Sequence, residues 1–89
     1  MRFVPRRCVY SLPKDYVDIA RVFMRVGRNT FFAQRLHVEE IGRLRAVRGA
    51  KPDVPQYFCI GKTDNVIEFY PPPEKAWRFT VDYLVRRSA

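Results

Sequence analysis

Residues 76–86 alternate between apolar and polar side chains, which favours an antiparallel β fold for this part of the chain. The residues of one parity are Trp77, Phe79, Val81, Tyr83 and Val85. Those of the other parity begin with Arg78, Thr80 and Asp82, and Leu84 and Arg86 follow. Because successive side chains of a strand point to opposite faces, the first set is predicted to form one buried face. We expect Phe79 to lie in the core, with Ile67 and Phe69 packed near it.

A β-hairpin is predicted over residues 11–36. Its strands, residues 16–26 and 30–36, are joined by Gly27-Arg28-Asn29. Gly and Asn tolerate the positive φ that tight hairpin turns require. Residues 1–10 precede the hairpin and contain a proline, which cannot donate a hydrogen bond at the centre of a sheet. This segment is therefore predicted to form an extended arm or an edge strand.

One helix is predicted, over residues 38–48, where the period of the apolar residues changes from two to three. The apolar stripe consists of Val38, Ile41, Leu44 and Val47. Acidic side chains come first and basic ones later, in the order Glu39, Glu40, Arg43, Arg45 and Arg48. This order suits the helix dipole, and Gly49 is a typical residue just beyond a helix. A helix this short is not stable alone, so we expect it to pack on a sheet.

Three strands are predicted to follow as a meander over residues 56–87. The first two, residues 56–60 and 66–70, flank a turn at residues 61–65, and the third is the alternating strand. The predicted fold class is therefore mainly β (α+β). It is a small antiparallel sheet or sandwich with one short helix inserted between a hairpin and a three-strand meander. A length of 89 residues fits a single domain over residues 1–89.

The chain is strongly basic, and its charge is carried mostly by arginine. Lys and Arg number 17 and Asp and Glu 9, which gives a net charge of +8. Arginine forms bidentate hydrogen bonds with both phosphates and carboxylates. The charge therefore fits a nucleic acid and a protein assembly surface equally well, and net charge does not choose between them.

The residue types that carry catalysis form no motif that we can connect to a reaction. His37 is the only histidine, and no nucleophile is linked to it. Glu39 and Glu40 are adjacent, so on a helix they point about 100° apart and form no carboxylate pair. Gly61-Lys62-Thr63 lacks the earlier glycine of a phosphate-binding loop, and a strand follows it instead of a helix. We therefore expect no enzymatic activity and no cofactor.

The cysteine content and the hydropathy of the sequence indicate in which cellular environment the chain works. A disulfide between Cys8 and Cys59 is arithmetically possible, but two free and buried thiols are favoured in a reducing cytosol. With one histidine, the two thiols cannot supply the four ligands of a structural zinc site. No apolar run approaches the roughly 18 residues that span a bilayer, and no apolar segment of a secretory signal follows the basic first residues. We expect no membrane partner.

Three ordered segments resemble the sheet region of head-to-tail adaptor, or connector, proteins in the neck of tailed bacteriophages. These segments begin with Pro55-Gln56-Tyr57-Phe58-Cys59-Ile60 and continue with Val66-Ile67-Glu68-Phe69-Tyr70-Pro71-Pro72-Pro73-Glu74 and Ala76-Trp77-Arg78-Phe79-Thr80-Val81-Asp82-Tyr83. Leu12-Pro13-Lys14-Asp15-Tyr16 resembles the motif that opens the first sheet strand of that family, and Val38-Glu39-Glu40-Ile41 resembles its short central helix. The resemblance extends from Tyr10 to Tyr83 and lies in the order of the motifs.

The resemblance implies a virion structural protein that forms a homo-oligomeric ring in the phage neck and joins portal and tail. Its partners would be identical copies, the portal and tail or other neck proteins, and the DNA backbone without sequence specificity. Such a protein is assembled in the host bacterial cytoplasm and ends in the virion. The alternative is a small basic cytosolic module that binds nucleic acid, such as a ribosome-associated protein, which the pI of about 10.1 favours.

The candidate contact residues lie in parts that a single domain does not need for its own core. For protein interfaces they are Arg2, Phe3, Arg6, Arg7, Arg28, Asn29, Lys62, Asp64, Arg86 and Arg87. For phosphates or acidic partners they are Arg43, Arg45 and Arg48. An arm of residues 1–7 that cannot sit in mid-sheet is free to lie along a neighbour, where main-chain pairing would order it. We therefore predict that deletion of this arm leaves the fold intact.

Overall fold

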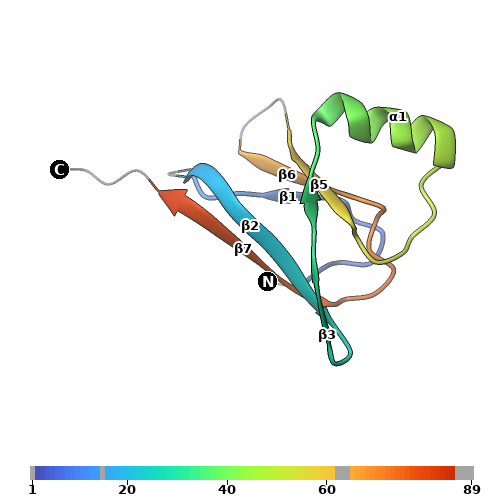
Figure 1. Cartoon of the computed structure of the whole chain (residues 1–89), viewed down its shortest axis with the longest axis horizontal. Coiled ribbons are helices and arrows are strands. Elements are labelled where there is room, and N and C mark those ends of the chain that lie inside the picture. Colours follow the sequence, from blue (N-terminus) through green and yellow to red (C-terminus); the bar gives the residue numbers. More distant parts are fainter. Residues whose placement is uncertain (1, 15, 62–64, 86–89) are drawn as a thin grey trace.

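Two small sheets pack face to face, and a single helix covers the far side of one of them (Figure 1). The structure is a computed structural model that describes residues 2–14, 16–61 and 65–85. We call the sheet beside the helix the helix-side sheet; its strands, in spatial order, are β1 (Val9–Ser11), β6 (Val66–Tyr70), β5 (Tyr57–Ile60) and β4 (Gln34–Arg35). The second, or outer, sheet consists of β3 (Asn29–Phe32), β2 (Tyr16–Val26) and β7 (Arg78–Val85). The mainly β fold class with one short helix is confirmed.

The returning strand of the hairpin divides between the two sheets. Strand β3 pairs with β2 across a turn in which Gly27 has a φ of 64°. The chain leaves the outer sheet after Ala33. The Ala33 amide makes the last bond to that sheet, to the Val22 carbonyl at 2.9 Å. The amide of Gln34 already bonds the Gln56 carbonyl at 2.8 Å. Strand β4 then runs parallel to β5, so the fold is not wholly antiparallel.

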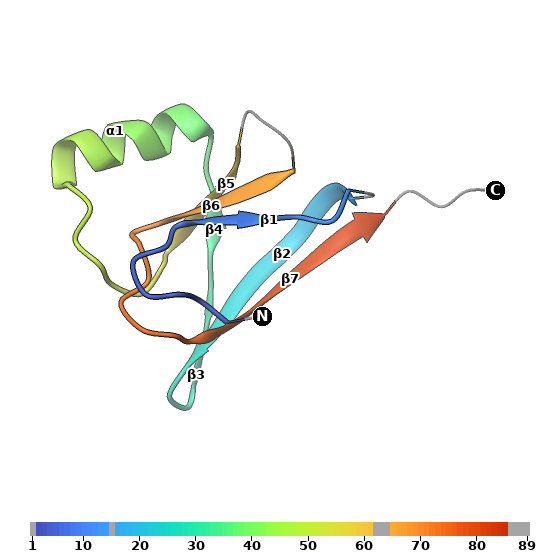
Figure 2. The same ribbon diagram turned by 180° about the vertical axis from the view of Figure 1, so that it is seen from behind.

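The predicted meander is wrong in its last step. Strands β5 and β6 pair as a hairpin, but β7 pairs with β2 of the outer sheet and not with β6. The three prolines at residues 71–73 lie between β6 and β7 and have no amide hydrogen to continue a ladder. The chain therefore ends its pairing in one sheet there and crosses to the other (Figure 2).

The main core lies between the two sheets and is rich in aromatic rings. Phe79 is 1% exposed, and Ile67 and Phe69 lie in the same cluster, as predicted. Val81 is also buried, but Tyr83 is 40% exposed and the half-buried Trp77 precedes the strand. The prediction of one fully buried face is therefore right only for the middle of β7.

An irregularity in β2 changes which of its residues face the core. Opposite β7, the register shifts between Ile19 and Arg21, which inserts one extra residue into β2. Ile19 is therefore buried together with Val22 and Met24, although its position has the opposite parity. A strict period of two cannot predict such a change.

The helix α1 (Val38–Arg48) has the bounds that the apolar spacing predicts, and it packs on β5. His37 caps its first turn by accepting a hydrogen bond from the Glu39 amide. Beneath the helix, Ile41 forms a second cluster with Cys59 and Tyr70. The Tyr70 hydroxyl donates to the Gly49 carbonyl at 2.7 Å and thereby fixes the end of the helix to the sheet.

The Cys59 thiol is expected to be unreactive toward thiol reagents in the folded protein. Burial, followed by the Glu68 carboxylate, raises the pKa of its thiol from 9.0 to about 11. Because only the thiolate is nucleophilic, a disulfide reagent at pH 7 should label Cys59 far more slowly than the half-buried Cys8. Between pH 9 and 11 the unfolded chain loses the Cys59 proton first, so the free energy of unfolding should fall as the pH rises. Equal labelling rates of both thiols in the native protein would contradict this prediction, and Cys59→Ala should flatten the pH slope.

Candidate interaction surface

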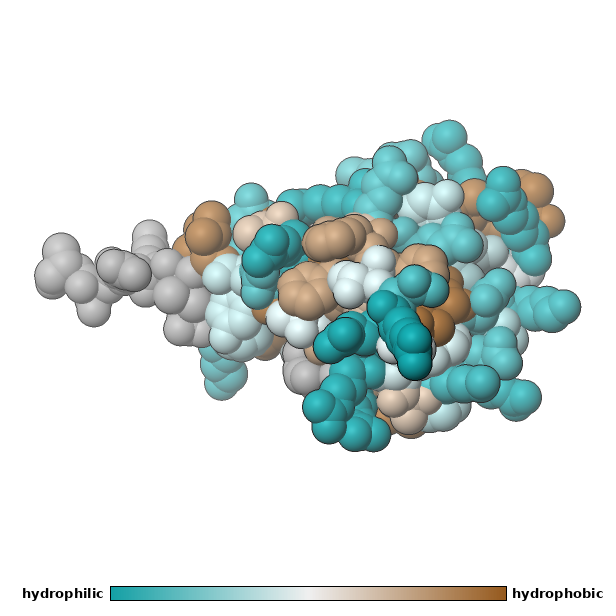
Figure 3. Space-filling view, turned by 60° about the horizontal axis from the view of Figure 1, so that its bottom comes forward, coloured by the Kyte–Doolittle hydropathy of each residue, from teal (hydrophilic) through white to brown (hydrophobic). Residues whose placement is uncertain are grey.

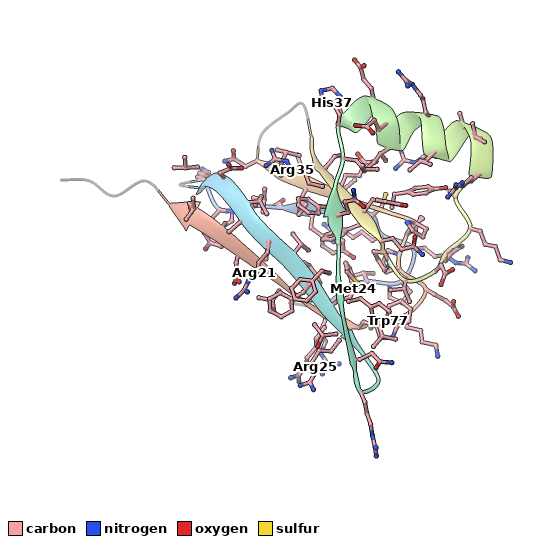
Figure 4. All side chains as sticks on the ribbon, viewed as in Figure 1. Arg21, Met24, Arg25, Arg35, His37 and Trp77 are labelled. Atoms are coloured by element: carbon pink, nitrogen blue, oxygen red, sulfur yellow. The ribbon has the colours of Figure 1, made fainter. Side chains whose placement is uncertain are left out.

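The face of the outer sheet that points away from the core carries mostly exposed side chains. Val22 and Met24 of β2 point into the core, so Arg21, Phe23 and Arg25 point the opposite way. Figure 4 shows Arg21 and Arg25 on one side of β2 and Met24 on the other. We call this the outer face. Arg21 and Arg25 are not among the contact residues predicted from the sequence. Their alternation with Val22 and Met24 does indicate that the arginines lie on the face opposite the core.

One half of the outer face combines ion pairs with exposed apolar side chains. Arg21 bonds Asp82 across the strands at 2.5 Å, and Arg35 bonds Asp18 at 2.9 Å. The Arg35 hydrogen bond, assisted by the Ile19 amide, holds the pKa of Asp18 below its usual value. Both pairs are exposed, so each contributes little to stability and instead fixes where the charges lie.

Aromatic and aliphatic side chains lie among these ion pairs. The rings of Phe23 and Phe32 are 5.7 Å apart, and the Arg21 guanidinium lies 5.6 Å from the Phe23 ring centre. Phe32 is 64% exposed and Leu84 58% exposed. Seen from below, the molecule presents apolar side chains at the surface with hydrophilic ones around them (Figure 3). Exposed aromatic residues next to arginine are typical of the centres of protein–protein interfaces.

The other half of the outer face is a row of arginines. Arg78 of β7 lies directly opposite Arg25 of β2, and on its other side it forms a bridge with Arg2. All three side chains are exposed, and within residues 2–14, 16–61 and 65–85 none of them forms an ion pair. We call these three residues the arginine row. Arg28 and Asn29, both predicted contact residues, are exposed at the adjoining hairpin.

The N-terminal arm is part of the fold, which corrects the prediction that it is free. Phe3 is 1% exposed, so its side chain is unavailable as an interface contact. Its amide bonds the Trp77 carbonyl at 2.9 Å. Arg6 has a φ of 68°, and its amide bonds the Pro73 carbonyl at 2.7 Å. The side chains of Arg6 and Arg7 are exposed, as the prediction of contact residues requires.

The helix arginines have separate roles. Arg45 forms an ion pair with Glu68 of β6, so it fastens α1 to the helix-side sheet and is not free for a phosphate. Arg43 and Arg48 are exposed beside a groove of about 490 Å³. This groove lies between α1 and the strands β4 and β5, and its lining includes Gln34, Leu36, Leu44, Val47 and Tyr57.

The remaining predicted contact residues, Lys62, Asp64, Arg86 and Arg87, lie outside the described residues. The part of the chain that the structure describes holds no group of three or more side chains suited to a metal ion. Nor is any helix in it long and apolar enough to cross a membrane.

Comparison with known proteins gave one match. A family model described as SU10 adaptor protein matches residues 3–89. No curated protein and no solved structure matched the chain. The matched residues include every strand and the helix, so the match concerns the whole of the architecture described above.

Proposed function

The chain belongs to the SU10 adaptor protein family, a family of phage head–tail adaptors, and on this basis we propose that it is a non-enzymatic ring subunit of the phage neck that joins portal and tail. The family confirms the resemblance found in the sequence and makes the chain a structural adaptor protein of a phage virion. The ring, the junction with portal and tail, assembly in the host bacterial cytoplasm and contact with the DNA backbone are parts of the proposal.

The observation that supports this role best is the half of the outer face that holds Phe32 and Leu84. Phe32 and Leu84 are largely exposed on a face that also holds fixed ion pairs, and a neighbouring copy can bury them. In a closed ring each subunit meets its neighbours through two different patches. Strand β7 is at the edge of the outer sheet and offers main-chain groups beside this surface. We propose that the next copy in the ring covers this half of the outer face.

Replacing both Phe32 and Leu84 with glutamine should prevent ring formation without unfolding the chain. Both side chains are largely exposed, so the thermal midpoint should change by only a few degrees. Native mass spectrometry of the purified protein, and the amount of it in particles, would measure assembly. We expect the variant to stay monomeric and to be missing from particles.

The matched control is Val47→Gln, which changes an exposed apolar residue on the helix, on the opposite side of the molecule. This control should assemble as the unchanged protein does. If the Phe32 and Leu84 variant enters particles at the normal level, another surface forms the ring contact and the proposal for this half of the outer face is wrong.

A further inference from the structure

The arginine row, which consists of Arg2, Arg25 and Arg78, has an arrangement that is unfavourable in the isolated chain. Like charges directly opposite each other on neighbouring strands repel, and Arg78 has such a neighbour on each side. Elsewhere on the same face the arginines are placed beside carboxylates, as Arg21 is beside Asp82. The described part of the chain supplies no carboxylate to the row. The positive charge of the arginine row is therefore available to bind an anionic partner molecule.

We propose that the arginine row, together with Arg28, binds the phosphate backbone of duplex DNA without sequence specificity. Neighbouring strands lie about 4.8 Å apart, so the row spans roughly 10 Å. Duplex DNA carries one negative charge per about 1.7 Å of its axis, so a stretch of that length offers roughly six charges. A protein surface would need three unpaired carboxylates within the same distance, and these would repel one another before binding. Charge density thus favours DNA over an acidic protein.

The chemistry of the row fits phosphate oxygens. Guanidinium groups present several N–H donors in a fixed plane and form paired hydrogen bonds with phosphate. The sheet holds the backbones of Arg25 and Arg78 in register, so two side chains reach the anion from fixed positions. The inference rests on the proposed function in one respect, which is that the chain meets DNA inside the virion. Binding of DNA by the arginine row does not itself require a ring.

Salt dependence of DNA binding by the purified chain tests the proposal. The probe is a 20-base-pair labelled duplex, measured by fluorescence anisotropy between 50 and 200 mM salt. With three to four phosphate contacts, the affinity should fall about 40- to 150-fold over this range. In the Arg25→Gln, Arg78→Gln double variant, the slope of log K against log salt should decrease by about 1.8. The thermal midpoint of this variant should stay the same or rise, because the repulsion is relieved.

Two controls isolate the site. Arg43→Gln with Arg48→Gln removes the same charge from the helix and should leave the slope unchanged. Arg25→Lys with Arg78→Lys keeps the charge and should keep most of the slope. Three results would overturn the proposal: no binding of the duplex by the unchanged protein, equal losses in both glutamine variants, or binding of poly-L-glutamate in place of DNA. None of these results depends on ring formation, so this test and the assembly test fail separately.

Discussion

Replacing Phe3 with alanine should destabilise the protein by about 3–5 kcal/mol, which is most of the stability of a small domain. Phe3 is almost completely buried and lies parallel to Phe79, with ring centres 4.3 Å apart. Its ring also meets Phe69 edge to face at 5.0 Å. The truncation leaves a cavity between the two sheets that these rings cannot fill. Urea unfolding followed by tryptophan fluorescence would measure the loss. Deletion of residues 1–7 removes the buried Phe3 side chain, so this deletion is expected to unfold the chain.

The control for Phe3 is its neighbour Val4, whose side chain is 49% exposed. Val4→Ala keeps the main-chain hydrogen bond from the Val4 amide to the Tyr10 hydroxyl and should change stability by about 0.5 kcal/mol or less. If Phe3→Ala were as mild as Val4→Ala, the arm would be free after all and the burial of Phe3 would be wrong.

Phe79→Ala should cost a similar amount, about 3–5 kcal/mol. The Phe79 ring lies within 5.3 Å of the Tyr10 and Phe69 ring centres in addition to its stack on Phe3. It therefore joins the N-terminal arm, the strands β1 and β6 of the helix-side sheet, and β7 in one cluster. Thermal unfolding of the two single variants would show both losses. The combined Phe3 and Phe79 variant should lose less than the sum, because the rings are in contact.

Tyr83→Ala separates the observed burial from the alternation predicted by the sequence. Strict alternation places Tyr83 on the same buried face as Phe79, but its side chain is 40% exposed. We expect this variant to lose about 1 kcal/mol, well below the loss of Phe79→Ala. Equal losses in the two variants would show that the core extends further along β7 than the structure indicates.

The local elements were predictable from the sequence because each depends on neighbouring residues. The helix from Val38 to Arg48 combines an apolar stripe with favourable charges at both ends. The hairpin turn at Gly27 depends on a conformation that few residues adopt. Both signals are complete within about ten residues, so no knowledge of the rest of the chain is needed.

The arrangement of the sheets was not predictable, because it depends on contacts between distant residues. Nothing near Ala33 marks the point where a continuous strand changes sheets. Phe3 lies between Arg2 and Val4, two residues before Pro5, so its local sequence suggests an arm. Its burial is explained only by the packing between the two sheets. The row of Arg2, Arg25 and Arg78 assembles residues from three separate segments. The contact residues predicted from the sequence therefore include Arg2 but not Arg25 or Arg78.

The pairing of β7 with β2 has a consequence for how the chain folds. The two strands are separated by more than fifty residues, and the arm around Phe3 also pairs with residues next to β7. Pairing between such distant segments requires the closure of long loops, which places folding in the slower range of milliseconds to seconds. On the ribosome, the β2–β3 hairpin emerges long before β7 and keeps an open strand edge until β7 arrives. The nascent chain is therefore most exposed to mispairing with other copies in the interval before β7 pairs with β2.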